Sequence, residues 1–137
     1  MQLIFEQIRS GGDRNFGYLL GDRDAQQAML IDPSYSPDQF VERARDQGLT
    51  VTRIVNTHSH PDHVNGNDRA VELTGAPIAA HPSMQPSLAL ADGGELSTGA
   101  IRLTVLYVPG HCADHVVNLQ RNGLEAMIGV ALAGQPS

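Results

Sequence analysis

Thr57-His58-Ser59-His60-Pro61-Asp62-His63 is the segment from which the fold and the chemistry of this chain are best predicted. The chain has 137 residues and six histidines, and three of the six lie in this one heptapeptide. Imidazole and carboxylate groups are the ligands that suit zinc and similar divalent ions. We therefore interpret the segment as part of a metal site rather than as a polar loop of solvated side chains.

The spacing of these donors predicts a loop. His58 and His60 are two residues apart, whereas neighbours on one face of a helix are three or four apart. Pro61 also disfavours helical geometry in the residue that precedes it. We expect the loop to fold His58 and His60 around one point and to direct Asp62 and His63 toward a second one.

The segments around the loop predict a layered α/β domain. Strands are expected at residues 3–8, 16–20, 28–31, 51–55, 77–80, 101–108, 115–119 and 124–128. The first three are short and joined by tight turns, which indicates antiparallel pairing. The β-branched run at 51–55 predicts a buried strand that brings the histidine loop to its carboxyl end, where open α/β sheets place their sites. Helices are expected to cover the faces of the sheet.

Two helices have clear boundaries in the sequence. Ser36 is a candidate N-cap, Pro37 suits the first helical position and Gln39 stands where a capping-box partner belongs. Gly48 is a natural end for this helix. A second helix is expected over residues 67–74, ended by Gly75.

Composition indicates one soluble domain spanning residues 1–137. Hydrophobic residues make up 41% and aromatic residues 4%, without tryptophan, so the core is expected to be aliphatic. The net charge is −6, and the nine basic residues are scattered arginines, which argues against a nucleic-acid partner. The single cysteine, Cys112, fits a reducing cytosol. We expect a cytoplasmic protein, because neither a signal peptide nor an apolar run of the ~20 residues that span a bilayer is found.

The histidine segment resembles the H-x-H-x-D-H signature of the metallo-β-lactamase superfamily. Over residues 1–129 the chain is most similar to its glyoxalase II-like thioester hydrolases and to the related persulfide dioxygenases. The resemblance implies an αββα sandwich, of which this chain would contain the first half and the start of the second. Pro109-Gly110-His111 matches a family segment that supplies a further ligand.

The resemblance also implies the ligand set. His58, His60 and His111 would bind the first metal ion, and Asp62 and His63 would contribute to a second. His81 lies beside Pro82, away from this cluster, and we expect a loop residue there without a ligand role.

The chain departs from the family pattern near its end. Where the family carries Gly-Asp, whose carboxylate bridges two metals, this chain has Gly129-Val130, and a valine side chain has no donor atom. We therefore expect one firmly bound zinc, with a second zinc or an iron as alternatives. A second sheet left incomplete would expose a strand edge through which the chain could form homo-oligomers.

With these donors, the resemblance implies a metal-dependent hydrolase that acts on a small thioester of the hydroxyacylglutathione type. A zinc ion would lower the pKa of its bound water from about 15.7 toward ~7 and so supply hydroxide at neutral pH. Asp62 is the candidate catalytic residue, which would orient this water or accept its proton. Two alternatives stay open. One is an iron-dependent persulfide dioxygenase that uses the same histidines, and the other is an inactive truncated relative that only binds metal, which Val130 suggests.

Overall fold

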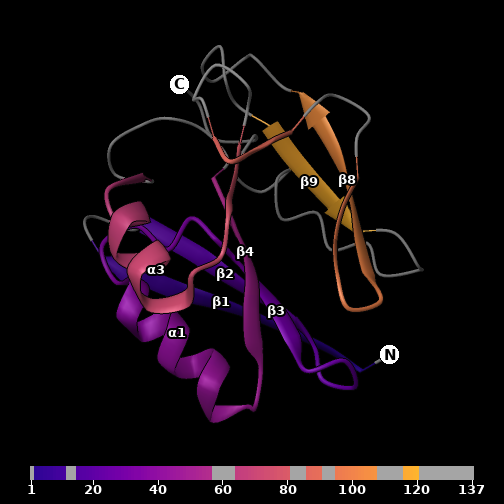
Figure 1. Ribbon diagram of the computed structural model, residues 1–137, viewed down its shortest axis with the longest axis horizontal. Coiled ribbons are helices and arrows are strands. Elements are labelled where there is room, and N and C mark those ends of the chain that lie inside the picture. Colours follow the sequence, from indigo (N-terminus) through magenta and orange to yellow (C-terminus); the bar gives the residue numbers. More distant parts are fainter. Residues whose placement is uncertain are drawn as a thin grey trace.

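Strands dominate the part of the chain that the computed structural model describes, which is residues 2–11, 15–56, 64–80, 86–90, 95–107 and 116–120. The elements in chain order are β1 (Leu3–Gly11), β2 (Asn15–Asp22), β3 (Gln27–Ile31), α1 (Pro37–Asp46), β4 (Thr50–Val55), α3 (Asn67–Thr74), β5 (Ile78–Ala80), β6 (Leu88–Ala89), β7 (Glu95–Thr98), β8 (Ile101–Tyr107) and β9 (Val116–Gln120) (Figure 1). Neither of these two helices is long and apolar enough to cross a membrane.

The strands form two sheets. The larger sheet has the order β1-β2-β3-β4-β5-β6, and the smaller one has the order β7-β8-β9. Strands β1, β2 and β3 pair antiparallel, as predicted, whereas β3, β4, β5 and β6 are parallel neighbours. The smaller sheet is antiparallel. Strand β7 (Glu95–Thr98) is not among the strands that the sequence predicted.

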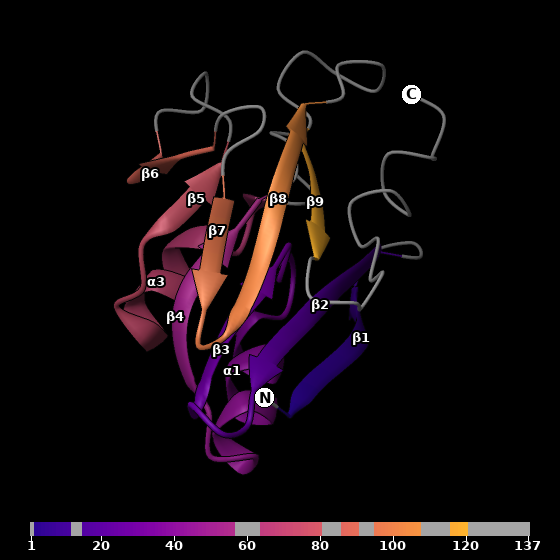
Figure 2. The ribbon, with the colours of Figure 1, turned by 90° about the vertical axis from the view of Figure 1, so that its right-hand side faces the viewer.

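Two apolar layers flank the larger sheet. Helices α1 and α3 lie on one face, and the smaller sheet lies on the other (Figure 2). Helices thus cover one face of the larger sheet, and a second sheet covers the other, as in the sandwich that the resemblance implies. The cluster between the two sheets consists of Tyr18, Leu20, Met29, Ile31, Val55, Ala79, Leu90, Leu96, Ile101 and Leu103. The cluster beneath the helices consists of Ile4, Ile8, Leu19, Ala28, Leu30, Phe40, Val41, Ala44, Leu49, Val51, Ile54, Ala70 and Ala76.

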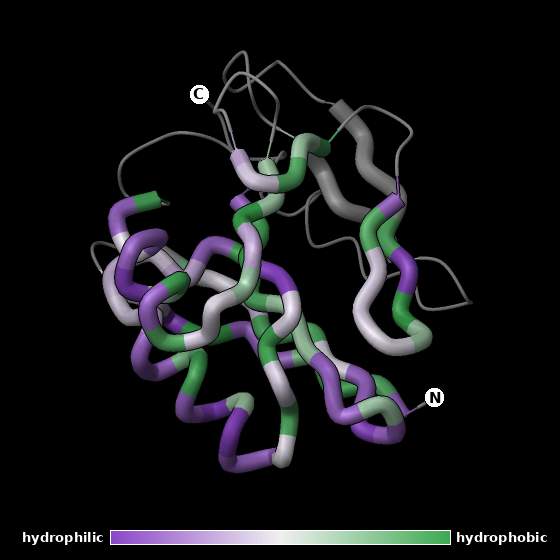
Figure 3. Tube along the Cα trace, viewed as in Figure 1, coloured by the Kyte–Doolittle hydropathy of each residue, from purple (hydrophilic) through white to green (hydrophobic). Residues whose placement is uncertain are grey.

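Helix α1 begins at Pro37 as predicted, but its start is not closed by a capping box. Ser36 occupies the N-cap position, and its side chain makes no capping hydrogen bond. The Ser36 hydroxyl instead donates to the carbonyl oxygen of Ser10 at 2.9 Å, which ties the helix start to β1. The otherwise hydrophilic helix has buried hydrophobic residues at Phe40, Val41 and Ala44 (Figure 3). Gly48 and Gly75 follow the two helices with φ of 73° and 68°, which confirms the predicted helix ends.

Asp22, the last residue of β2, joins the two sheets through its buried carboxylate. Its Oδ2 accepts a hydrogen bond from the backbone N–H of Ala100, between β7 and β8, at 2.8 Å. Its Oδ1 accepts from the backbone N–H of Asp24 at 3.0 Å and of Ala25 at 3.3 Å. These donors, Ala100 foremost, lower the pKa of Asp22 below its usual 3.8, although burial acts in the opposite direction.

Replacing Asp22 with asparagine should lower the free energy of unfolding by about 2 kcal/mol at pH 7, since the amide nitrogen cannot accept the bond that the second oxygen accepts. Because the folded-state pKa is lowered, this stabilisation is fully present above about pH 4, the unfolded-state value, and is lost as the pH falls through the folded-state pKa. Urea unfolding of both proteins from pH 7 to pH 3 measures it. A stability difference that stays constant over this range would show that the carboxylate charge is not its source.

Candidate functional site

Three parallel strands of the larger sheet, β3, β4 and β5, have their carboxyl ends side by side, and we call this row of strand ends the carboxyl edge. In the register, Ile31 of β3 is opposite Val55 of β4, and Val55 is opposite Ala79 of β5. The backbone N–H of Asp32 donates to the carbonyl oxygen of Val55 at 2.8 Å, and that of Asn56 donates to Ala79 at 3.0 Å. The chain positions that follow β3 and β4 are therefore fixed side by side at this edge.

The predicted metal donors follow these strand ends in the sequence. His58, His60, Asp62 and His63 come directly after β4, and all four lie outside the described residues, as does His111. The assignment of these five donors stays a prediction. Within the described ranges, no group of three or more His, Cys, Asp and Glu side chains is arranged to hold a metal ion.

The direction of the strands nevertheless favours bringing the two donor segments together. Strand β8 runs toward the same end of the molecule as β4 in both ribbon views (Figures 1 and 2). Residues 57–63 follow β4, and His111 comes shortly after the end of β8 at Tyr107. The described strand ends that precede the two predicted donor segments, those of β4 and β8, therefore lie toward the same end of the sandwich, although the two strands belong to different sheets.

The turn after β3 is buried and conformationally unusual. Asp32 and Ser34 have φ of 50° and 52°, in the left-handed region that side chains other than glycine rarely adopt. Both residues are buried, and the Ser34 hydroxyl donates to the carbonyl oxygen of Asp32 at 3.1 Å. Such backbone conformations persist where the surroundings over-determine them, which is common at functional sites. The sequence predicted only that a strand ends here.

Two glycines allow the backbone to approach this turn. A Cβ atom at Gly66 would overlap the carbonyl oxygen of Ser34, and one at Gly17 would overlap the carbonyl oxygen of Asp32. Gly66 directly precedes α3, so the chain that leaves the histidine segment packs against the turn after β3. A larger residue at either position would force these backbones apart.

Two asparagines join the strand end to the helix start. Asn56 follows β4 and is fully buried, and Asn67 is the first residue of α3. The Asn56 amide nitrogen donates to Asn67 Oδ1 at 3.1 Å, and the Asn67 amide nitrogen donates to Asn56 Oδ1 at 2.6 Å. The pair thus spans residues 57–66, which include four of the predicted donors. We did not predict this pair, because no periodicity connects two residues at these positions.

Tyr18, whose pKa is influenced by the charge of Asp32, stays neutral at physiological pH. Tyr18 lies in the apolar cluster between the sheets, and burial raises the pKa of its hydroxyl. A hydrogen bond from Gln7 acts in the opposite direction, and the negative charge of Asp32 adds a smaller increase to the pKa. The inter-sheet core therefore carries a phenol next to this edge rather than a phenolate.

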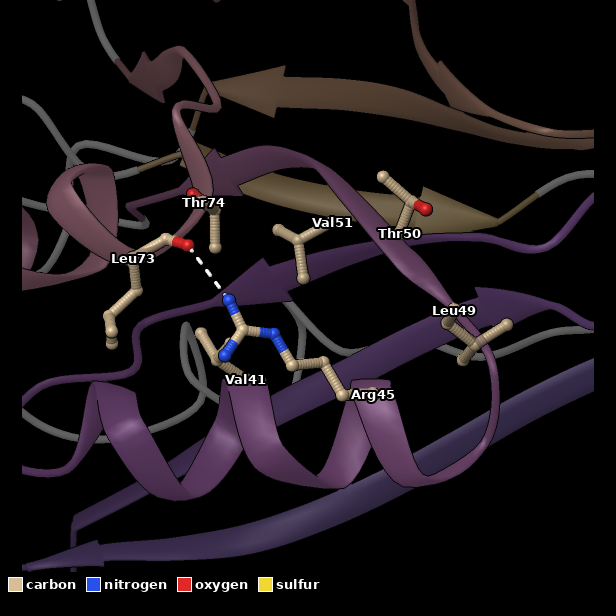
Figure 4. A pocket seen from close by; sticks show the side chains of 7 residues that line it. All are labelled: Val41, Arg45, Leu49, Thr50, Val51, Leu73 and Thr74. Carbon is tan, nitrogen blue, oxygen red and sulfur yellow. Dashed lines mark hydrogen bonds between the residues drawn. The ribbon is translucent and has the colours of Figure 1, made fainter.

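A cavity of about 180 Å³ lies away from this edge, between the two helices and the amino-terminal part of β4 (Figure 4). Thr50 and Val51 line its floor at the start of β4, whereas the histidine segment follows the end of that strand. The Arg45 guanidinium donates to the carbonyl oxygen of Leu73 at 3.1 Å within it. This cavity is therefore not part of the candidate metal site.

The two-sheet arrangement with helices on one face can be compared with known protein families. Residues 11–94, which include the histidine segment, match the model of the metallo-beta-lactamase superfamily, and the chain belongs to that superfamily. The structure is also similar to the BLEG-1 B3 metallo-beta-lactamase, with a TM-score of 0.77 at 21% identity over 85% of this chain and 67% of that one. The sandwich fold expected from the sequence is thereby confirmed in the described part.

Within this superfamily, the chain is similar to hydroxyacylglutathione hydrolases. The chain is 36% identical over 120 residues to a hydroxyacylglutathione hydrolase of Maricaulis maris (strain MCS10) and 33% identical over 121 residues to one of Polaromonas sp. (strain JS666). These matches cover 84% and 83% of this chain but 46% of each relative, so the chain spans about half their length. The structure of ETHE1 from Myxococcus xanthus is similar at 29% identity and a TM-score of 0.77, over 85% of this chain and 53% of that one.

Proposed function

We propose that this protein is a metal-dependent hydrolase that cleaves small thioesters of the hydroxyacylglutathione type. The observation that carries the proposal is the position of the H-x-H-x-D-H segment, directly after the buried end of β4 at an edge shared by three parallel strands. The similarity to hydroxyacylglutathione hydrolases supports the substrate class. In the reaction, water adds to the thioester carbonyl, the carbon–sulfur bond breaks, and a hydroxy acid and a thiol leave.

The donor set fits a zinc ion. His58, His60 and His111 are three imidazoles, a set that leaves a fourth position open as in catalytic zinc sites. Asp62 and His63 would bind a second ion. Val130 has no donor atom and so cannot contribute a ligand to either ion. When bound, zinc supplies acidified water and polarises the thioester carbonyl. Iron is the alternative ion, because three imidazoles suit both metals.

The residues of the chain supply the proton transfer and the support. Asp62 would orient the attacking water or accept its proton. Two contacts with the turn after β3 support the chain on either side of the histidine segment. The backbone of Asp32 binds that of Val55 before the segment, and Gly66 packs closely against Ser34 after it. Removing that support would misplace the donors rather than remove them.

The surroundings of the reaction are part of the same proposal. We expect the protein to act in the cytoplasm on a small thioester, without nucleic acid or a membrane as a partner. Two copies could associate through an edge strand of the smaller sheet, whose described strands are β7, β8 and β9.

The test is the metal content and the hydrolytic activity of the chain purified without added metal or chelator. We expect about one zinc per chain and hydrolysis of a hydroxyacylglutathione thioester that a chelator abolishes and zinc restores. A folded protein that contains no metal, or that contains zinc but leaves the thioester intact, would contradict the proposal.

A second candidate function is an iron-dependent persulfide dioxygenase, which the similarity to ETHE1 supports to a lesser degree. The same purified chain distinguishes the two. Iron in place of zinc, together with oxygen uptake when glutathione persulfide is added, would favour the dioxygenase.

A further inference from the structure

The reciprocal amide pair of Asn56 and Asn67 closes the segment that carries four of the predicted donors. Each side chain donates one hydrogen bond to the other and accepts one, at 3.1 and 2.6 Å. Asparagine is suited to this role because its amide offers a donor and an acceptor on one short, rigid group. The pair therefore fixes both the separation and the relative orientation of the two residues.

Both members of the pair are themselves anchored. The Asn56 backbone donates to the carbonyl oxygen of Ala79 at 3.0 Å, and its side chain is fully buried. Asn67 begins α3, whose first turn is formed when Ala70 donates to the carbonyl oxygen of Gly66 at 2.9 Å. The ends of residues 57–66 are thus tied to a central strand and to a helix, rather than only to each other.

We propose that this pair is a positioning device for the metal site. It holds the two ends of the histidine segment at a fixed distance. The conformational entropy that His58, His60, Asp62 and His63 lose when an ion binds is therefore smaller, and the affinity for the ion is higher. Asn56 and Asn67 contact neither the ion nor the substrate in this proposal. The inference rests on the proposed function, because it takes these four residues as metal donors.

The experiment measures the affinity of the intact chain for zinc, by competition with a chromophoric chelator and without any substrate. The variants are Asn56→Ala, Asn67→Ala and the double variant. Asn65→Ala is the matched control, because Asn65 lies in the same segment and its side chain is exposed. Thermal unfolding of each metal-free variant is recorded alongside.

Each single variant should bind zinc about 10- to 100-fold more weakly than the wild type, the range typical of residues that orient metal ligands. The double variant should bind no more weakly than the worse single one, since the two side chains act as one unit. Asn65→Ala should keep the wild-type affinity.

Two results would overturn the inference. In the first, the Asn56 and Asn67 variants unfold at lower temperature but, when folded, bind zinc as tightly as the wild type, so that the pair stabilises the fold alone. In the second, the wild-type chain binds no zinc. A chain that binds zinc, loses affinity in these variants and still leaves thioesters intact would overturn the proposed function and leave this inference standing.

Discussion

Replacing His58 and His60 together with alanine should abolish zinc binding at micromolar concentrations and lower thioester hydrolysis by roughly a thousandfold or more. The reason is the ligand count, because only one imidazole of the three-histidine set would remain. A catalytic metal contributes several kcal/mol of transition-state stabilisation, and each 1.4 kcal/mol or so is a factor of ten in rate. Metal analysis of the purified variant and a thioester assay measure both effects.

His81→Ala is the matched control for this experiment. His81 belongs to the same residue type but carries no ligand spacing, and we expect this variant to keep both zinc and activity. Circular dichroism of all variants in chelator separates loss of the ion from loss of the fold. Equal zinc losses in the His81 variant and the double variant would mean that the ligand set is assigned wrongly.

The sequence predicted the elements whose signals are local. The β-branched run before the histidine segment is strand β4, and Gly48 and Gly75, which follow the two helices, adopt positive φ. Strand β7 was missed because it has four residues and its partner lies across a tight turn. Ser36 is the N-cap residue as predicted, but its hydroxyl contacts Ser10, 26 positions away, in place of a capping hydrogen bond that the sequence pattern favoured.

The candidate site also combines residues with a local sequence signal and contacts that the sequence did not predict. Four of the five predicted donors come from one heptapeptide, since ligand type and spacing are local properties, and His111 was added by the resemblance of its segment to the family. Its support was not predicted, because the pair of Asn56 and Asn67 and the contact of Gly66 with Ser34 join separate elements. The positive φ of Asp32 has the same origin, as the surrounding strands rather than the residue type fix it.

Phe40→Ala should lower the free energy of unfolding by about 4 kcal/mol, in the range found for phenylalanines truncated in a core. Phe40 is fully buried and belongs to the cluster beneath the helices. Its ring lies against β2 so closely that a Cβ atom at Gly17 would come within 2.7 Å of its Cζ. Truncation would leave a cavity between α1 and the sheet, because the backbone on both sides is fixed by hydrogen bonds.

Phe5→Ala provides the matched control for that cavity. Phe5 is 43% exposed and stacks on Tyr18 with ring centroids 5.8 Å apart, so its loss should cost only about 1 kcal/mol. Urea unfolding of both variants in chelator compares them without any contribution from a bound ion. Equal costs for the two would show that α1 does not pack on β2 as described. A large cost for Phe40 alone would show that the cluster beneath the helices is tightly packed.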